Sequence, residues 1–279
     1  MIKKKIGVIG CGNMGSALVE NLRKRSAALE IFVFDKDQEK QNSLVKGFKV
    51  QPSVAIQTLV SFCDVIIIAV KPQDIDDVLS LLKGISGKLV ISIAAGVTIS
   101  SLESFLTDKV AVVRAMPNLN ALIGRSVTAL SFNSAVGEED KNLALEIFQA
   151  VGEVVFVKES LMNAVTAISG SGPAFVAYLI KGLGEGALNK IFIQEAEKFG
   201  IEHSIALKLA NGTVSGTQEM LRVNLDPDIL IKRVSSKGGT TEAGMKVLEQ
   251  KGKTKAALSE AIRAACLRAG ELSRRNDNG

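Results

Sequence analysis

Two patterns of apolar residues divide the chain near residue 158. Before it, short apolar runs alternate with segments in which apolar residues recur at helical spacing. The strands predicted from these runs are residues 6–9, 31–34, 48–50, 64–70, 89–93, 110–113, 127–130 and 154–157. The run at 64–70 is β-branched without alternation, as is typical of a strand buried on both faces of a parallel sheet. This order predicts a doubly wound α/β domain over residues 1–158.

Beyond residue 158 the strand pattern stops and helical periodicity takes over. The predicted helices of the first part are residues 16–22, 37–46, 53–61, 74–83, 98–105 and 138–150. Those of the second part are residues 161–190, 193–199, 204–222, 227–233, 241–250 and 254–274. We therefore expect an all-helical domain over residues 159–279. Its first helix contains Gly170, Gly172, Gly182, Gly184 and Gly186, each costing about 1 kcal/mol relative to alanine. Close approach between helices would compensate.

A glycine-rich turn, Gly-Cys-Gly-Asn-Met-Gly at residues 10–15, follows the first predicted strand and opens a predicted helix. The G-x-G-x-x-G spacing is typical of a dinucleotide-binding Rossmann turn. Gly10 permits the tight turn, Gly12 lets the backbone approach a pyrophosphate, and Gly15 lets the helix pack on the strand. All six residues, including Cys11, Asn13 and Met14, are predicted to bind cofactor. The alternative is a structural turn without ligand.

Asp35 ends the second predicted strand, 20 residues beyond Gly15. A carboxylate in this place can accept hydrogen bonds from both hydroxyls of the adenosine ribose. It would also repel the 2′-phosphate of NADPH, so we expect the cofactor to be NAD(P)H with NADH preferred. Lys36 could swing toward such a phosphate and offset part of the repulsion.

Composition excludes several function classes. The 279 residues are 47% hydrophobic, which suits a sizeable core, and the formal charge of +5 is spread over both halves. With no Trp and one Tyr, there is little to stack on bases, so no nucleic-acid partner is expected. Three dispersed cysteines and a single histidine give no metal-site spacing and fit a reducing cytoplasm. The apolar stretch 164–180 is interrupted and too short for a bilayer, so no membrane association is expected.

Six short motifs occur one after another along the whole chain. They are Gly-Cys-Gly-Asn-Met-Gly at 10–15, Ala-Val-Lys-Pro at 69–72, Ser-Ile-Ala-Ala-Gly at 92–96, Arg-Ala-Met-Pro-Asn at 114–118, Ser-Gly-Ser-Gly-Pro-Ala at 169–174 and Ser-Lys-Gly-Gly-Thr-Thr at 236–241. In this combination the chain resembles the pyrroline-5-carboxylate reductase family. The resemblance implies an N-terminal Rossmann domain and a C-terminal helical dimerisation domain. It also implies a homodimer that can assemble further, and NAD(P)H-dependent reduction of a cyclic imine, 1-pyrroline-5-carboxylate, to L-proline.

The resemblance also implies where the substrate binds. Thr241 matches the family position whose hydroxyl contacts the ring nitrogen, and we predict an orienting and proton-relay role for it. Ser236, Gly239 and Thr240 are predicted to bind the substrate carboxylate at a helix start. Thr241, Ser236 or Thr240 could instead cap the helix backbone, and the two roles are compatible. Glu159 matches a position near the substrate, although a carboxylate that opens a helix also offsets the helix dipole.

Two further strand ends are predicted to line the cofactor site. Residues 69–72, Ala-Val-Lys-Pro, are expected to form a backbone lip against the cofactor ribose, with Lys71 at the crevice edge where ligands of doubly wound sheets sit. The alternative for Lys71 is a solvated surface lysine. Ala94, Ala95 and Gly96 are small enough to admit the nicotinamide ring.

The chain departs from the family pattern in two loops. Asn118-Leu-Asn-Ala121 stands where the family usually has Asn-Thr-Pro-Ala, and Lys237 stands where it usually has proline. Glu242 follows the second threonine where an apolar residue is usual. These departures bear on substrate choice and rate more than on fold or cofactor.

Two other functions stay open at this stage. A β-hydroxyacid dehydrogenase would need a lysine base in the helical domain, for which Lys181 is the nearest candidate. A regulatory relative that binds cofactor without turnover is the other.

Overall fold

The computed structural model describes residues 2–106, 109–223 and 226–277. Met1 and Gly279, the outer limits of the two predicted domains, lie outside the described residues. The strands are β1 (Ile6–Ile9), β2 (Ile31–Phe34), β3 (Gln51–Pro52), β4 (Val65–Ile68), β5 (Leu89–Ser92), β6 (Ala111–Met116), β7 (Ser126–Phe132) and β8 (Gly152–Phe156). They form one sheet in the order β3-β2-β1-β4-β5-β6-β7-β8. Strands β1 to β6 pair in parallel, whereas β7 pairs antiparallel with β6 and parallel with β8. The predicted doubly wound sheet is confirmed, but it is parallel only as far as β6.

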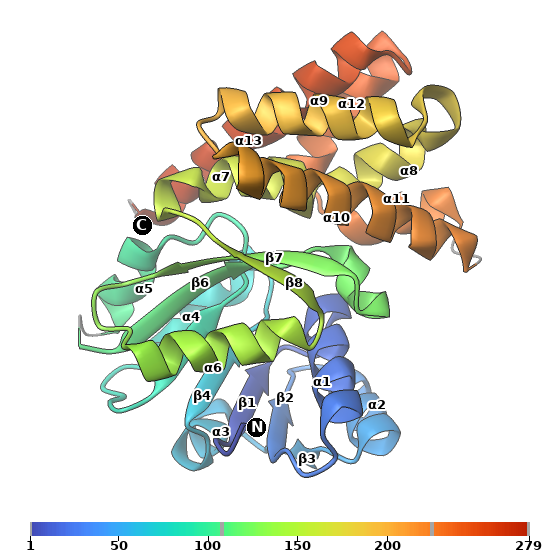
Figure 1. Cartoon of the computed structure of the whole chain (residues 1–279). Coiled ribbons are helices and arrows are strands. Elements are labelled where there is room, and N and C mark those ends of the chain that lie inside the picture. The colour runs from blue at the N-terminus through green and yellow to red at the C-terminus, as the bar shows by residue number, and fades with distance from the viewer. Residues whose placement is uncertain (1, 107–108, 224–225, 278–279) are drawn as a thin grey trace.

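Helices cover both faces of this sheet (Figure 1). They are α1 (Asn13–Arg25), α2 (Gln38–Phe48), α3 (Ile56–Phe62), α4 (Ile75–Ser80), α5 (Ile99–Phe105) and α6 (Glu138–Gln149), with short 3-10 turns η1 (Pro72–Asp74) and η2 (Leu119–Ile123). Successive strand residues point to opposite faces, so Val8 joins the core under α1, α2 and α6, and Ile9 joins the core under α3, α4 and α5. Burial on both faces explains the unbroken apolar run of β4.

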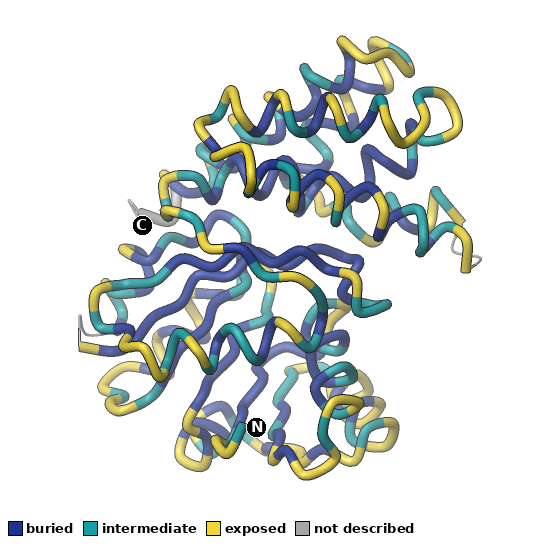
Figure 2. The backbone as a smooth tube through the Cα atoms, viewed as in Figure 1, coloured by how far each residue is buried: buried dark blue, intermediate teal, exposed yellow. Residues whose placement is uncertain are grey.

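The second part of the chain is helical throughout its described residues. After η3 (Glu159–Leu161) come α7 (Met162–Val165), the π-helical turn η4 (Thr166–Gly170), α8 (Gly172–Leu183), α9 (Glu185–Lys198), α10 (His203–Arg222), α11 (Pro227–Val234), α12 (Thr240–Lys251) and α13 (Lys255–Asp277). These helices pack around an apolar core that they share with one end of the sheet, since it includes Met116, Val127, Ala129 and Val155, and the exposed residues gather on their outer sides (Figure 2). The last helix, α13, returns to the sheet domain and contacts α5.

The prediction of one continuous helix over residues 161–190 is wrong. Gly184 adopts φ +73°, a left-handed conformation that ends α8, and α9 then continues to Lys198 without the break predicted near residue 191. Upstream, the chain makes a π turn in which the Ser171 amide bonds to the Thr166 carbonyl at 2.8 Å. Both features interrupt a segment whose apolar periodicity continues, so that periodicity does not report them.

The predicted strand 48–50 is also wrong. Helix α2 runs on through Phe48, and Lys49 ends it in the left-handed region at φ 52°. The strand follows as two residues, Gln51 and Pro52, paired with β2 at the sheet edge. Proline lacks an amide hydrogen, and an edge position tolerates that loss.

No single helix among the described residues is long and apolar enough to cross a bilayer. The bent pair formed by residues 159–170 and 172–183 passes only on length and composition.

Candidate active site

Two adjoining cavities lie at the carboxyl ends of β1, β2, β4, β5 and β6. One has a volume of about 440 Å³ and the other of about 260 Å³. They share Ala69, Val70 and Lys71, which follow β4, so they lie side by side along one edge of the sheet. Strand order reverses between β1 and β4, and such a switch point is where open α/β sheets bind ligands.

The larger cavity, here called the nucleotide cavity, is built around the glycine turn. Gly10 has φ +106°, and a Cβ there would lie 2.7 Å from the Ala69 backbone. A Cβ on Gly15 would lie 1.9 Å from the Gly10 carbonyl oxygen. By contrast, no described atom lies within 4 Å of a Cβ built on Gly12, which lines the cavity. Gly10 and Gly15 are therefore required by packing, whereas Gly12 leaves open space for a ligand.

Asp35 lines the same cavity and also holds the turn in place. Its Oδ2 accepts from the Cys11 amide at 2.6 Å, and its Oδ1 accepts from the Asp37 amide at 2.8 Å. Burial, and then the charge of Asp35, raise the pKa of the Cys11 thiol to about 12. Cys11 thus remains a protonated, buried thiol. Lys36 donates to Asp74 across the cavity rim at 2.6 Å, which raises the pKa of its ammonium.

The smaller cavity, here called the hydroxyl cavity, combines strand ends with the helical domain. The sheet domain contributes Asn13, Met14, Pro72, Ala94 and Ala95, and the helical domain contributes Ser236, Thr240 and Thr241. The structure thus brings Ser236, Thr240 and Thr241 next to the predicted nicotinamide residues, whereas Gly239 and Glu159 do not line this cavity. The Thr241 side chain donates to Ser171 Oγ at 3.0 Å, and Ser171 Oγ lies 2.9 Å from Thr240 Oγ1.

The loop 236–239 forms a tight entry to α12. A Cβ on Gly239 would lie 2.2 Å from Ser236 Oγ, which could rotate away, and 3.1 Å from the Ser236 carbonyl oxygen, so glycine relieves crowding there. Glu242 accepts a hydrogen bond from the Gly238 amide and pairs with Lys246 at 3.2 Å. These two contacts hold the pKa of Glu242 below its usual value. The departure at position 242 is therefore explained: the carboxylate caps the loop from the first turn of the helix.

The loop after β6 carries the other departure. Asn120 is fully buried, and its Nδ2 donates to the carbonyls of Gly212 and Thr213 at 3.2 and 3.3 Å. Its Oδ1 accepts from Thr217 Oγ1 at 3.3 Å. Asn120 thereby ties η2 to α10 across the domains. Its neighbour Leu119 lines the hydroxyl cavity.

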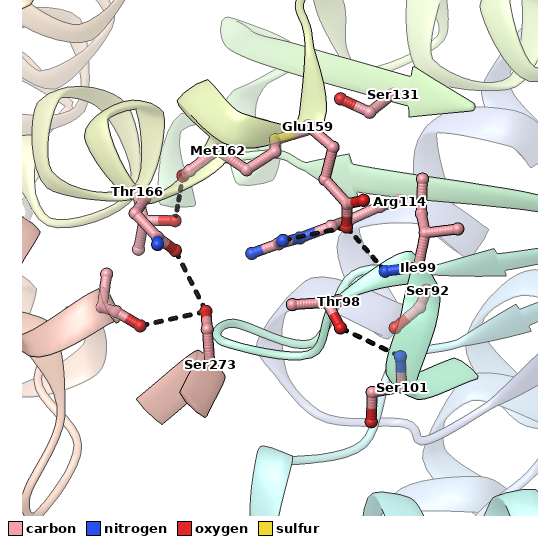
Figure 3. A network of polar contacts seen from close by, with 12 residues as sticks. Ser92, Thr98, Ile99, Ser101, Arg114, Ser131, Glu159, Met162, Thr166 and Ser273 are labelled. Carbon is pink, nitrogen blue, oxygen red and sulfur yellow. Dashed lines mark hydrogen bonds and ion pairs between the residues drawn. The ribbon is translucent and has the colours of Figure 1, made fainter. Parts of the chain in front are cut away.

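Glu159 does not line the hydroxyl cavity and lies beside Ile99 and Arg114 (Figure 3). Its Oε1 accepts from the Ile99 amide at 2.6 Å and from the buried guanidinium of Arg114 at 3.2 Å. It lines a third cavity, of about 670 Å³, that also includes Ser273 and Arg114. The contact with Ile99 caps the first turn of α5, so in this structure Glu159 serves the fold and not the hydroxyl cavity.

Some predicted site residues lie outside both site cavities. Cys11 and Gly15 pack in or beside the glycine turn, and a Cβ on Gly96 would lie 2.8 Å from Leu272 Cβ of α13. Sequence reasoning also missed residues that line the hydroxyl cavity: Ile93, Met116, Pro117, Asn118, Leu119, Thr166, Gly170, Arg233 and Val234. The Arg-Ala-Met-Pro-Asn motif held the signal for three of these, since it contains Met116, Pro117 and Asn118 at the end of β6.

The residues present fit a dinucleotide. An open Gly12, a carboxylate at the end of β2 and a cleft that continues past small alanines match the requirements of pyrophosphate, ribose and ring. Among the described residues, no group of three or more His, Cys, Asp or Glu side chains could hold a metal ion.

Comparison with known proteins identifies the family. The chain is 40% identical over 275 residues to a pyrroline-5-carboxylate reductase from Synechocystis sp., and the alignment covers 97% of this chain and 99% of the relative. The chain belongs to the pyrroline-5-carboxylate reductase family. The Escherichia coli member is 34% identical over 278 residues, covering 98% of this chain and all of the relative.

Other comparisons agree with this family. The model for pyrroline-5-carboxylate reductase dimerisation matches residues 159–272, and that for F420-dependent NADP oxidoreductase matches residues 5–96. A Plasmodium falciparum pyrroline carboxylate reductase with NADP bound aligns over 98% of this chain and 99% of its own, with TM-score 0.67 and 29% identity. A prephenate dehydrogenase from A. aeolicus, with TM-score 0.53 and 14% identity, shows only the fold. Lys181, the base that a β-hydroxyacid dehydrogenase would need, is exposed on α8 and lines neither site cavity.

Proposed function

We propose that this chain catalyses the NAD(P)H-dependent reduction of 1-pyrroline-5-carboxylate to L-proline. The proposal rests on the placement of the two cavities: Thr240 and Thr241 line the same cavity as Met14 and Ala94, and that cavity shares Ala69, Val70 and Lys71 with the one lined by Gly12. A dinucleotide bound on the glycine turn would reach the hydroxyl cavity with its nicotinamide end. The names of the relatives support the same reaction.

The chain's own residues bind and orient the imine. When bound, the reduced cofactor supplies a hydride. Thr241 Oγ1 hydrogen-bonds the ring nitrogen, which fixes one face of the C=N bond toward the strand ends. Ser236, Thr240 and the first-turn amides of α12 bind the carboxylate, since these amides have no intrahelical partners and carry the positive end of the helix dipole. Gly239 allows the tight loop that brings Ser236 there.

We further propose that NADH is preferred. The Asp35 carboxylate lines the nucleotide cavity and would face the 2′-phosphate of NADPH. Lys36 is engaged with Asp74, so its ammonium is not free to neutralise that phosphate without breaking an ion pair. The structure of the P. falciparum relative contains bound NADP, so the cofactor preference has to be measured on this chain itself.

We also propose a homodimer, able to assemble further, built through a helical domain whose boundary lies between residues 158 and 159. Support comes from the match to a dimerisation model over residues 159–272 and from Leu267, which is 70% exposed on α13. Light scattering at micromolar concentration should show a dimer or a multiple of it; a stable monomer would refute the assembly.

We also propose that the protein lies in the cytoplasm and has no nucleic-acid or membrane partner.

The direct test is turnover by the purified protein. With reduced cofactor and 1-pyrroline-5-carboxylate, absorbance of the reduced nicotinamide should fall, faster with NADH than with NADPH at equal concentration. Turnover with hydroxy or keto acids only would indicate a β-hydroxyacid dehydrogenase. Cofactor binding without turnover on any of these would indicate a regulatory relative.

A further inference from the structure

Ser171 is a fully buried residue that lies behind the hydroxyl cavity and does not line it. It follows the π turn η4 and precedes Gly172, the first residue of α8. A π turn adds one residue to the helical register, and such turns are frequent at functional sites. Two residues of this turn, Thr166 and Gly170, line the cavity. The turn therefore places Ser171 directly beneath the cavity wall.

The Ser171 hydroxyl contacts both threonines of the proposed substrate site. Its Oγ accepts from Thr241 at 3.0 Å and lies 2.9 Å from Thr240 Oγ1. All three side chains are at least 92% buried, since Thr240 is 8% exposed and the others less. In such surroundings a hydroxyl that loses its partner costs about 1–3 kcal/mol. The three hydroxyls form one chain with Ser171 in the middle.

The hydrogen bonds between these three hydroxyls run in one direction. Each hydroxyl carries one hydrogen, and two hydrogens are used when Thr241 donates to Ser171 and Ser171 donates to Thr240. The Thr240 end then has a hydrogen to donate into the cavity, and the Thr241 end has free lone pairs that accept. One end suits a carboxylate and the other suits a protonated ring nitrogen.

We propose that Ser171 is a positioning residue that orients Thr241 toward the substrate nitrogen and Thr240 toward the substrate carboxylate. The inference rests on the proposed function. The substrate then binds as the iminium carboxylate, with its N–H donating to Thr241. When the imine carbon takes up the hydride, the π electron pair moves to the nitrogen, which keeps its proton. The resulting amine gains a second proton from water.

A purely structural reading is that Ser171 only fastens α12 to α8. The two readings differ in whether the effect of Ser171 depends on Thr241. Ser169 provides a matched control, because it belongs to the same motif and is equally buried. Its hydroxyl donates to the Val127 carbonyl at 3.2 Å and accepts from Asn118, without contact to either threonine.

The test is a double-mutant cycle on kcat/KM for 1-pyrroline-5-carboxylate. We expect Ser171→Ala to lower kcat/KM about tenfold in the wild-type background and only about threefold in the Thr241→Ala background, where its effect through Thr240 is all that is left. Ser169→Ala should change kcat/KM by the same factor in both backgrounds. Cofactor affinity, measured by calorimetry, should be unchanged by Ser171→Ala.

Equal effects of Ser171→Ala in both backgrounds would overturn the positioning role while leaving the proposed function intact. If Ser171→Ala does not fold, Ser171→Cys keeps the size of the side chain with a much weaker hydrogen-bonding group and enters the same cycle. Absence of imine reduction by the wild-type protein would overturn the proposed function, and the role of Ser171 with it.

Discussion

Replacing Asn120 by alanine removes the polar link between η2 and α10. The amide makes three hydrogen bonds of 3.2 to 3.3 Å with Gly212, Thr213 and Thr217. A typical intramolecular hydrogen bond contributes about 0.5–1.5 kcal/mol net. Thr217 keeps another acceptor, the Thr213 carbonyl at 2.7 Å, so the substitution leaves its hydroxyl satisfied. Three such bonds together contribute about 1.5–4.5 kcal/mol. We therefore expect Asn120→Ala to lower the free energy of unfolding by about 2 kcal/mol, in the lower half of that range.

Urea denaturation at a fixed protein concentration measures this loss as a lower midpoint with an unchanged slope. Asn211→Ala is the matched control, since Asn211 is exposed on the same helix, and its effect should stay within about 0.5 kcal/mol. We also expect kcat/KM of Asn120→Ala to fall a few-fold, because η2 carries Leu119 into the cavity wall. Equal stability of the Asn120 and Asn211 variants would refute the reasoning.

Three other perturbations test separate parts of the site and the fold. Asp35→Ser should raise the ratio of kcat/KM for NADPH over NADH about tenfold; an unchanged ratio would mean that Asp35 does not select against the phosphate. Thr241→Ala should lower kcat at least about tenfold, or 1.4 kcal/mol, with cofactor affinity preserved, and full turnover in a folded variant would remove Thr241 from the mechanism. Glu195 is buried, which by itself raises its pKa, but its bonds to Arg263 and Lys198 outweigh burial and lower it. A lowered folded-state pKa stabilises the fold above the unfolded-state value and loses that contribution as pH falls through the folded-state value. Glu195→Gln should thus cost stability at pH 7 and less below pH 4; a difference constant with pH would contradict this.

The glycine turn and the position along the chain of every strand but β3 could be predicted from sequence because their signals are local. Gly10 has the φ of +106° that its turn requires, Gly15 lies against the Gly10 carbonyl, and β4 is apolar because both of its faces are covered. Gly96 has a φ of +75° that favours glycine locally, but the atom that a Cβ there would meet at 2.8 Å is Leu272 Cβ, which lies in the last helix. No local pattern contains that contact.

The helical domain was harder to predict for the same physical reason. Apolar periodicity runs through residues 161–190 and does not report the left-handed Gly184 or the π turn before Ser171. Asn120 stood out only as a departure from a family pattern, and its partners lie more than 90 residues further along the chain. Glu159 likewise contacts Ile99 and Arg114, which lie far from it in the sequence, and does not line the hydroxyl cavity.

Transfer of a labelled hydride tests the central claim most directly, that one cleft brings a reduced nicotinamide to an imine held by Thr241. The protein would be incubated with 1-pyrroline-5-carboxylate and NADH deuterated at the hydride position, and the product analysed by mass spectrometry. The account predicts L-proline with deuterium on the ring carbon that was the imine carbon. Formation of no proline, or of proline without the label when both hydride positions have been tested, would contradict it.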